Sequence, residues 1–381
     1  MTSQRVSPRT LPGEPGSPAR DWGDRMTGGA RQPLVELFIE GVDLDLVDVT
    51  LTPPSVPKTL AWCWAYLERS VPHPSRVQLV VTGYMAGSVA RWAPEVDAAG
   101  IHAVQHGAEL SAGKTLRLPD GRAVVLLHAH YFRNDLDRDQ TEVNDLIAKR
   151  VLVHEAQHVV MHQNQQVYQP DPSASFRDLN LVGGAAAIIE EYRAEISVDD
   201  TFRRGEPLWK PATIIAGLQA NLDGAVATYQ GHRSVSRLVF EVTSSVLVGW
   251  RGLAYAAARD VVVPESGLVD VVWTNPAWSR AFEDCWHDFS AVLDRVEPAG
   301  LIMSRQALDA LAAEFAEIIN DSMIDLGFLW HDDIFMIEPW FVESPTYATA
   351  VVATRADALT TVQRLRTRWA RRPVLGGLIS G

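Results

Sequence analysis

Two histidines and a glutamate form the stretch of this chain best suited to chemistry. The chain reads His154-Glu155-Ala156-Gln157-His158 there, with the two imidazoles four residues apart. Residues with this spacing lie on one face of a helix, so His154 and His158 can bind one cation together. Glu155 lies about 100° round the same helix and can reach a water molecule on that cation. The pattern predicts a zinc site with Glu155 as the catalytic base.

A long helix is expected to carry these residues. Asp139 as N-cap and Glu142 three residues later are typical of a capping box. Apolar side chains then recur every three or four residues and lead directly into the histidine stripe. The opposite side is apolar as well, so we expect the helix to be buried nearly all round. Two buried imidazoles on one stripe need a partner, and a metal ion would provide it.

A second helix is expected to supply the third zinc ligand. Catalytic zinc usually takes three protein ligands and one water molecule. The dense carboxylate cluster downstream lies between Glu190 and Glu195, in a segment whose apolar residues have helical spacing. Glu191 and Glu195 share a face one turn apart, so one can bind the metal while the other orients a histidine. We prefer Glu191 as ligand and Glu195 as the supporting residue, with Glu190 as the alternative ligand; the plainer interpretation is that these acids are solvated charges paired with Arg193.

The spacing after the second histidine separates this motif from the metzincin pattern. That pattern requires a glycine where this chain has Met161 and a third histidine where it has Asn164. His162 lies one turn beyond His158, but its direction has rotated away from that of His154. We expect His162 to support the site from the second shell or to pack in the core rather than to bind metal.

Both motifs resemble those of the ImmA/IrrE group of zinc metallopeptidases, within the HExxH zincin superfamily. Residues 154–162 are similar to the H-E-x-G-H-x-x-x-H motif of that group, and residues 191–195 to its later E-x-x-A-N/D motif. The resemblance implies a zinc ion held by His154, His158 and Glu191, with Glu155 as general base. Gln157 replaces the usual glycine, and Glu195 replaces the usual amide or aspartate.

Length and composition are consistent with an intracellular enzyme of one or two domains, and domain sizes of about 100 to 200 residues suggest two lobes. The chain has 381 residues, of which 47% are hydrophobic, enough for a sizeable core. We predict an α+β fold: a zincin-like metallopeptidase domain in residues 34–205, with a small mixed sheet, the HExxH helix and the glutamate helix, then a mostly helical lobe in 206–372. Residues 1–33, rich in Pro, Gly, Ser and Arg, are expected to be a disordered tail, and residues 373–381 a C-terminal tail.

Hydrophobic periodicity gives the expected elements around the two motifs. Before the first motif we expect strands within 34–51 and at 77–81, a hairpin of 114–118 with 123–132, and helices at 59–69 and 87–97. After residue 205 we expect helices at 212–228, 235–259, 277–296, 304–324 and 355–371.

Charge and cysteine content indicate which ligands and which cysteine chemistry to expect. The formal net charge is −13. The first 33 residues carry +2 and the Arg364–Arg372 run carries +5, which leaves −20 for the body of the chain. Because the body is acidic, nucleic acid is not expected as a ligand. Cys63 and Cys285 are expected to be buried core thiols. No signal peptide or membrane span is expected, because Glu241 and Arg251 interrupt the most apolar stretch, and a cytoplasmic location follows by default.

The predicted activity is Zn²⁺-dependent hydrolysis of peptide bonds in a peptide or protein substrate. The oligomeric state is left open. Two other interpretations remain: a zinc-stabilised regulatory or binding protein with negligible turnover, and a helical interaction protein in which the motif is accidental. Residues that could help to stabilise an oxyanion are Tyr168, Tyr192, His232 and His331.

Other histidine pairs are weaker candidates. His128 and His130 alternate on a predicted strand and would face the same way, although such residues are more often ordinary polar or core residues. His102 and His106 have helical spacing but lie in a short segment between glycines, so we expect no second metal site there.

Overall fold

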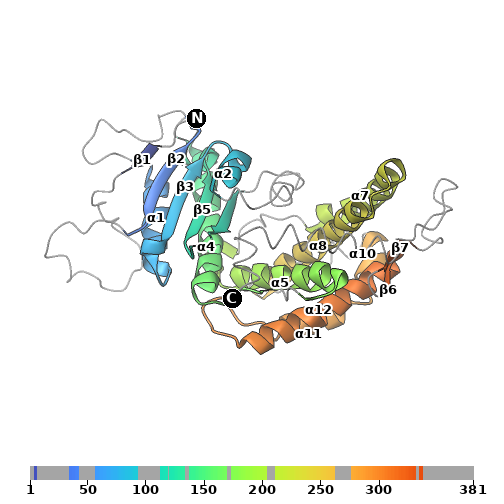
Figure 1. Ribbon diagram of the computed structural model, residues 1–381. Coiled ribbons are helices and arrows are strands. Elements are labelled where there is room, and N and C mark those ends of the chain that lie inside the picture. The colour runs from blue at the N-terminus through green and yellow to red at the C-terminus, as the bar shows by residue number, and fades with distance from the viewer. Residues whose placement is uncertain are drawn as a thin grey trace. The chain divides into compact units, whose positions relative to one another are not determined.

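The computed structural model describes residues 4–6, 34–42, 56–92, 112–118, 120–133, 137–169, 173–203, 211–261, 276–331 and 334–337. Contacts divide the chain into two compact units, Met1–Gln163 and Asn164–Gly381. The first contains a small mixed sheet with helices, and the second is mostly helical (Figure 1). The predicted α+β class is confirmed.

A five-stranded mixed sheet in the order β1-β2-β3-β5-β4 forms the centre of the first unit. Strands β2, β3 and β5 are parallel, and β1 and β4 pair antiparallel at the two ends. All six residues of β3 are buried, as expected of a strand covered on both faces. The strands are β1 (Gln4–Val6), β2 (Glu36–Glu40), β3 (Val77–Thr82), β4 (Gly113–Arg117) and β5 (Ala123–His128).

Helices cover both faces of this sheet. Helix α2 (Met85–Trp92) packs on the face that includes Leu126. Helix α4 (Arg138–Gln163) packs against β4, β5 and α1 (Lys58–Ser70), on the face to which Leu127 points. Adjacent residues of a strand point to opposite faces, so α2 and α4 lie on opposite sides. Two short 3₁₀ turns, η2 (Pro74–Arg76) and η3 (Ala129–Phe132), complete the described part of this unit.

Helix α4 starts earlier and is less evenly buried than the sequence predicts. The carboxylate of Asp137, not that of Asp139, accepts a hydrogen bond from the backbone N–H of Gln140 at 2.8 Å and so caps the first turn. Val143 and Leu146, in the first turns of the helix, are 51% and 43% exposed. Every residue from Arg150 to Met161 is buried. Burial all round therefore holds for the half of the helix that carries the histidines.

The second unit is built on the long helix α5, which packs against α8 and α12, while α7 packs against α8. Trp250 is at the centre of its core, in contact with the rings of Phe282, Phe289 and Phe315, and its indole N–H donates to Ser322 Oγ at 3.0 Å. The elements are α5 (Phe176–Ile196), α6 (Asp200–Arg203), α7 (Pro211–His232), α8 (Val235–Asp260), α10 (Pro276–Ala281), α11 (Trp286–Leu293), α12 (Arg305–Asp325), β6 (Phe328–His331) and β7 (Ile334–Ile337).

Several expected boundaries differ from the structure. The predicted domain 34–205 includes α5, whereas its contacts with α8 and α12 assign it to the second unit. The predicted helix at 277–296 is two helices, α10 and α11, separated by turns, and the antiparallel β6–β7 hairpin was not predicted. Residues 4–6, expected in the disordered tail, pair with β2. The helix predicted at 355–371, the C-terminal tail and the Arg364–Arg372 run lie outside the described residues.

Both cysteines are buried, as predicted. Burial and nearby carboxylates raise the pKa of the Cys285 thiol to about 12, and burial raises that of Cys63 well above its ordinary value. Both thiols are therefore poor nucleophiles at neutral pH. Among the described helices, none combines the length and the apolar character needed to cross a membrane.

Arg193 of α5 joins this helix to the loop before α12. Its guanidinium donates to the carbonyl oxygens of Glu297, Pro298 and Leu301 at 2.9, 3.4 and 2.8 Å, and the residue is fully buried. The arginine that the sequence suggested as an ion-pair partner for Glu190 or Glu195 is thus occupied by main-chain acceptors. This contact fixes how α5 is rotated about its axis.

Replacing Arg193 should therefore destabilise the second unit. We expect Arg193→Ala to lower the free energy of unfolding by about 2–5 kcal/mol, because it leaves buried carbonyl groups without a donor. Arg237→Ala is the control: this exposed arginine pairs with Glu241 one turn away, an interaction worth about 0–0.5 kcal/mol. Urea unfolding followed by circular dichroism measures both, and equal effects would contradict the role given to Arg193.

Candidate metal centre

The two histidines of α4 meet as the helical spacing predicts. Their Nε2 atoms are 3.2 Å apart, and both residues are buried. Nitrogen ligands lie about 2.0–2.1 Å from zinc, so two of them on one tetrahedral ion are about 3.3 Å apart. The separation of the two imidazoles therefore fits a shared metal ion without a change of rotamer.

Close packing of α4 on the sheet holds this part of the helix in place. Gly113 of β4 lies against it: a Cβ added there would be 2.4 Å from Val151 Cγ1 and 3.3 Å from Glu155 Cγ. A side chain at this position would collide with the helix, so glycine is required for the close approach. The hydroxyl of Thr115, two residues along β4, donates to the carbonyl oxygen of Glu155 at 3.0 Å. Strand β4 thus supports the turn that carries Glu155.

Helix α5 presents Glu191 from a well-anchored position. Ser175 caps the helix by accepting a hydrogen bond from the N–H of Asp178 at 3.0 Å. Two turns before Glu191, Gly184 lies so close to α8 that an added Cβ would be 2.5 Å from Leu247 Cδ1. Tyr255 of α8 donates its phenolic O–H to Glu191 Oε2.

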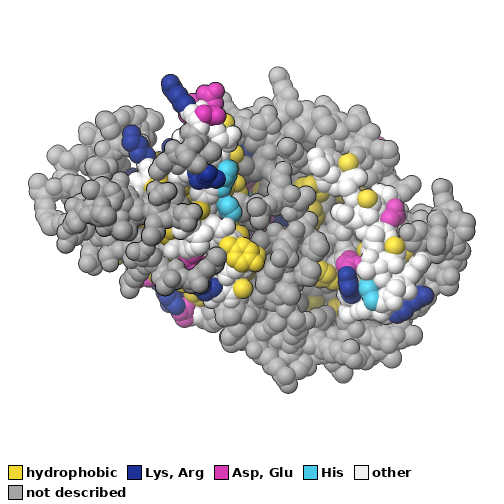
Figure 2. Space-filling view, turned by 90° about the horizontal axis from the view of Figure 1, so that it is seen from above, with side chains coloured by type: hydrophobic (Ala, Val, Ile, Leu, Met, Phe, Trp, Pro, Cys, Tyr) yellow, Lys and Arg dark blue, Asp and Glu magenta, His cyan; other side chains and the backbone are white. Residues whose placement is uncertain are grey.

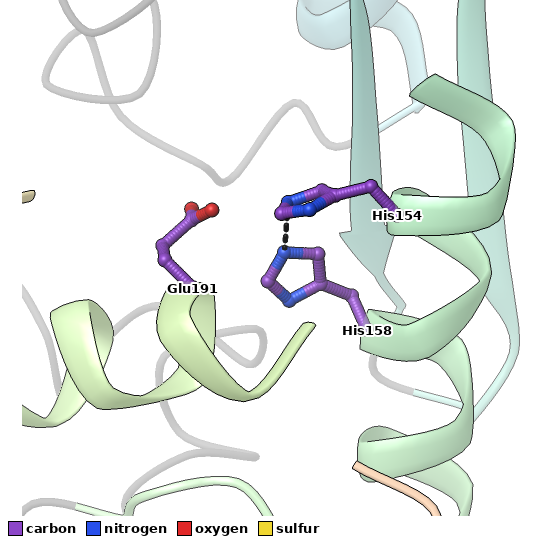
Figure 3. A group of neighbouring side chains, drawn as sticks. All are labelled: His154, His158 and Glu191. Carbon is purple, nitrogen blue, oxygen red and sulfur yellow. Dashed lines mark hydrogen bonds between the residues drawn. The ribbon is translucent and has the colours of Figure 1, made fainter. Parts of the chain in front are cut away.

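His154, His158 and Glu191 form one group whose candidate ligand atoms all lie within 4.8 Å of one another (Figure 3). The carboxylate of Glu191 points towards the two imidazole rings, which come from successive turns of α4. Among the described residues this is the one group of at least three histidine, cysteine or acidic side chains with such spacing. The predicted ligands are therefore the residues that the structure brings together.

The donor set of this group suits zinc. Two neutral imidazoles and one carboxylate are borderline and hard ligands, and a set of two histidines and one glutamate is found in catalytic zinc sites that keep a fourth position open. His154 and His158 are buried and Glu191 is partly buried, which limits competition from water. The group can therefore hold a metal ion.

The neighbouring acids have different surroundings. Glu190, the alternative ligand, accepts a hydrogen bond from the backbone N–H of Tyr168 at 2.9 Å and is not a member of the group. Glu195 is 3% exposed, so it is not a solvated surface charge. His162 is half-buried in the last turn of α4, and it too is outside the group. The supporting roles predicted for Glu195 and His162 stay predictions.

The aromatic partner of Glu191 was not among the residues considered from the sequence. Burial, and then the nearby carboxylate of Glu191, raise the pKa of Tyr255 well above its ordinary value, so that this phenol stays protonated and can donate. Of the four residues suggested for the oxyanion, Tyr192 is buried in the apolar core, and Tyr168 packs against the guanidinium of Arg305. Tyr255 lies 64 residues from Glu191 in the chain, and no local pattern connects them.

The remaining histidines lie in other surroundings. His232 accepts a hydrogen bond at Nδ1 from the N–H of Ser234, at 2.8 Å, and the side chain of His331 lies outside the described part of the chain. His102 and His106 also lie outside it. Histidine side chains do reach the surface, where Figure 2 shows them beside a basic side chain.

His128 and His130 do not alternate on one strand as predicted, because β5 ends at His128 and His130 lies in the turn η3. His128 Nδ1 accepts a hydrogen bond from the N–H of His130 at 3.1 Å. Burial and the charge of His130 lower the pKa of His128. This pair is part of a chain turn, and neither residue belongs to the metal-binding group.

The chain matches no known protein family, no curated protein and no solved structure. Its likeness to the ImmA/IrrE metallopeptidases therefore rests on the two short motifs and on the grouping of His154, His158 and Glu191.

Proposed function

We propose that this protein is a zinc-dependent peptidase in which His154, His158 and Glu191 hold the metal ion. The observation that carries the proposal is the grouping of these three side chains, with Glu155 next to the first of them in the chain. Two histidines on successive helical turns plus a glutamate from another helix are the ligands of a glutamate-type zincin. A bound zinc ion supplies Lewis acidity and lowers the pKa of a water molecule in its open position.

The place of Glu155 in the sequence supports the role of general base. Glu155 follows His154 directly, so its side chain leaves α4 about 100° round from the ligand stripe and does not compete for the metal. Its residue is buried, and its Cγ lies over Gly113 of β4, which limits the directions that the carboxylate can take. In the proposed reaction Glu155 accepts a proton from the attacking water and later returns it to the amine that leaves.

The substrate class follows from this chemistry and from the resemblance of the two motifs. A peptide bond is a stable amide, whose hydrolysis needs both a base for the water and a proton for the departing nitrogen. One carboxylate that first takes and then gives a proton meets both needs. The sequence preference of the peptidase, and whether it cleaves within a chain or at an end, are left open.

The first test is metal content. We expect about one zinc ion per chain, because three protein ligands and one water molecule complete a tetrahedral site. His154→Ala and His158→Ala should lose it, whereas His287→Ala, which alters an exposed histidine of α11, should keep it. Metal analysis of the purified proteins by mass spectrometry measures this. Full retention of zinc by either of the first two variants would contradict the assignment of His154 and His158 as zinc ligands.

The second test separates the base from the ligands. Glu155→Gln keeps the size of the side chain but removes its basicity, so zinc should stay bound while hydrolysis of a fluorescently labelled casein falls by at least about a hundredfold. Loss of zinc from this variant would make Glu155 a ligand. Wild-type protein that holds zinc but cleaves no labelled protein would instead favour the regulatory interpretation.

The third test ranks the acids of α5 by zinc affinity, measured by competition with a chelator. Glu191→Ala should weaken binding most, because it removes a coordination bond and a charge, while Glu195→Ala should cost about 10- to 100-fold. Glu190→Ala should leave the affinity unchanged but lower the free energy of unfolding by about 1–2 kcal/mol, since the N–H of Tyr168 loses its acceptor. A larger loss of zinc in the Glu190 or Glu195 variant than in the Glu191 variant would mean that the ligand is misassigned.

A further inference from the structure

The carboxylate of Glu191 has a dedicated partner on another helix. The phenolic O–H of Tyr255, in the last third of α8, donates a hydrogen bond to Glu191 Oε2. Tyr255 is 9% exposed, and its helix α8 packs against α5. A buried phenol beside a carboxylate is a directed polar contact between the two helices.

The packing of α5 against α8 brings these two residues together. Gly184 approaches Leu247 two turns before the hydrogen bond, and from there both helices run in the same direction, to Glu191 on one and Tyr255 on the other. The missing side chain of Gly184 allows the close approach, since a Cβ there would be 2.5 Å from Leu247 Cδ1. The close packing of α5 against α8 thus brings Tyr255 within hydrogen-bonding distance of Glu191.

We propose that Tyr255 is a positioning residue of the metal centre, which holds the Glu191 carboxylate in the orientation that binds the metal ion. This inference rests on the proposed function, because it assumes that Glu191 is a zinc ligand. A carboxylate has two oxygens with about four sites for accepting bonds, so one hydrogen bond from a phenol leaves room for a metal ion.

Positioning matters here because a glutamate side chain is flexible. Fixing a glutamate on metal binding costs side-chain entropy, and a hydrogen bond that already fixes the side chain reduces this cost. Outer residues that orient metal ligands typically contribute about 10- to 100-fold to metal affinity. Tyr255 acts on zinc through Glu191, so its effect should disappear when Glu191 is absent.

The experiment compares Tyr255→Phe with a matched control, Tyr229→Phe. Tyr229 is also a buried tyrosine of the second unit, and its ring contacts are with His232 and Arg233. Zinc affinity of the full chain is measured by competition with a chelator, and thermal unfolding of the metal-free proteins reports on folding. Cobalt(II), which takes similar ligands and absorbs visible light, reports on the geometry of the bound ion through its spectrum.

We expect Tyr255→Phe to weaken zinc binding by about 10- to 100-fold and to change the cobalt spectrum, while Tyr229→Phe changes neither. A double-mutant cycle adds the decisive comparison: Tyr255→Phe should have no further effect on zinc affinity in a Glu191→Ala background. This comparison holds even if the single variant is less stable, because a general loss of stability would weaken both backgrounds alike.

The results of these experiments distinguish the positioning role of Tyr255 from the zinc site itself. Wild-type affinity and an unchanged spectrum in Tyr255→Phe would overturn the positioning role while the zinc site stands. An equal loss of affinity with and without Glu191 would also overturn it, since Tyr255 would then act through packing alone. Wild-type protein that binds no zinc would overturn the proposed function, and the positioning role with it.

Discussion

Two imidazole Nε2 atoms held 3.2 Å apart on a buried part of α4 can share one proton or bind one cation, and both arrangements require the rings to keep their orientation. Solvent water has little access to these two rings, because every residue from Arg150 to Met161 is buried. Burial of polar groups without partners is costly, so the surroundings of these two rings are constrained more strongly than those of an ordinary surface pair. Strand β4 of the first unit supports the turn of α4 that carries the histidines. Gly113 lets the helix lie against β4, and the hydroxyl of Thr115 donates to the carbonyl oxygen of Glu155.

The rotation of helix α5 about its own axis is constrained as well. This rotation decides which of its glutamates points towards the two histidines. Three residues close together on α5 have partners in different directions: Glu190 binds the N–H of Tyr168, Glu191 binds Tyr255, and Arg193 binds three carbonyl oxygens of the loop before α12. Successive residues of a helix differ in direction by about 100°. A rotation that presented Glu190 in place of Glu191 would break all three sets of contacts at once.

The positions that depart from the ImmA/IrrE motifs are both buried. Gln157 and Glu195 are 9% and 3% exposed. Neither belongs to the group of His154, His158 and Glu191, so the departures leave the candidate ligand atoms intact. Glu195 lies close enough to Tyr255 to raise the pKa of the phenol together with burial and Glu191, and so belongs to the surroundings of the hydrogen bond between Tyr255 and Glu191.

What the sequence alone determined is local: the spacing of His154 and His158, the adjacent Glu155, the helical periodicity around them, and the short runs bounded by turn residues that give β3, β4 and β5. These follow from hydrogen bonds and side-chain directions that repeat over a few residues. The tertiary structure decided what depends on distant contacts. It separated Glu191 from Glu190 and Glu195, because only packing fixes the rotation of α5. It also placed Tyr255 on Glu191 across 64 residues, exposed the first turns of α4, and divided the chain after Gln163 because α5 packs with α8 and α12. Periodicity shows which face of a helix is apolar but not which partner covers it. For that reason the pairing of His154 with His158 could be predicted from the chain, whereas the partner of Glu191 could not.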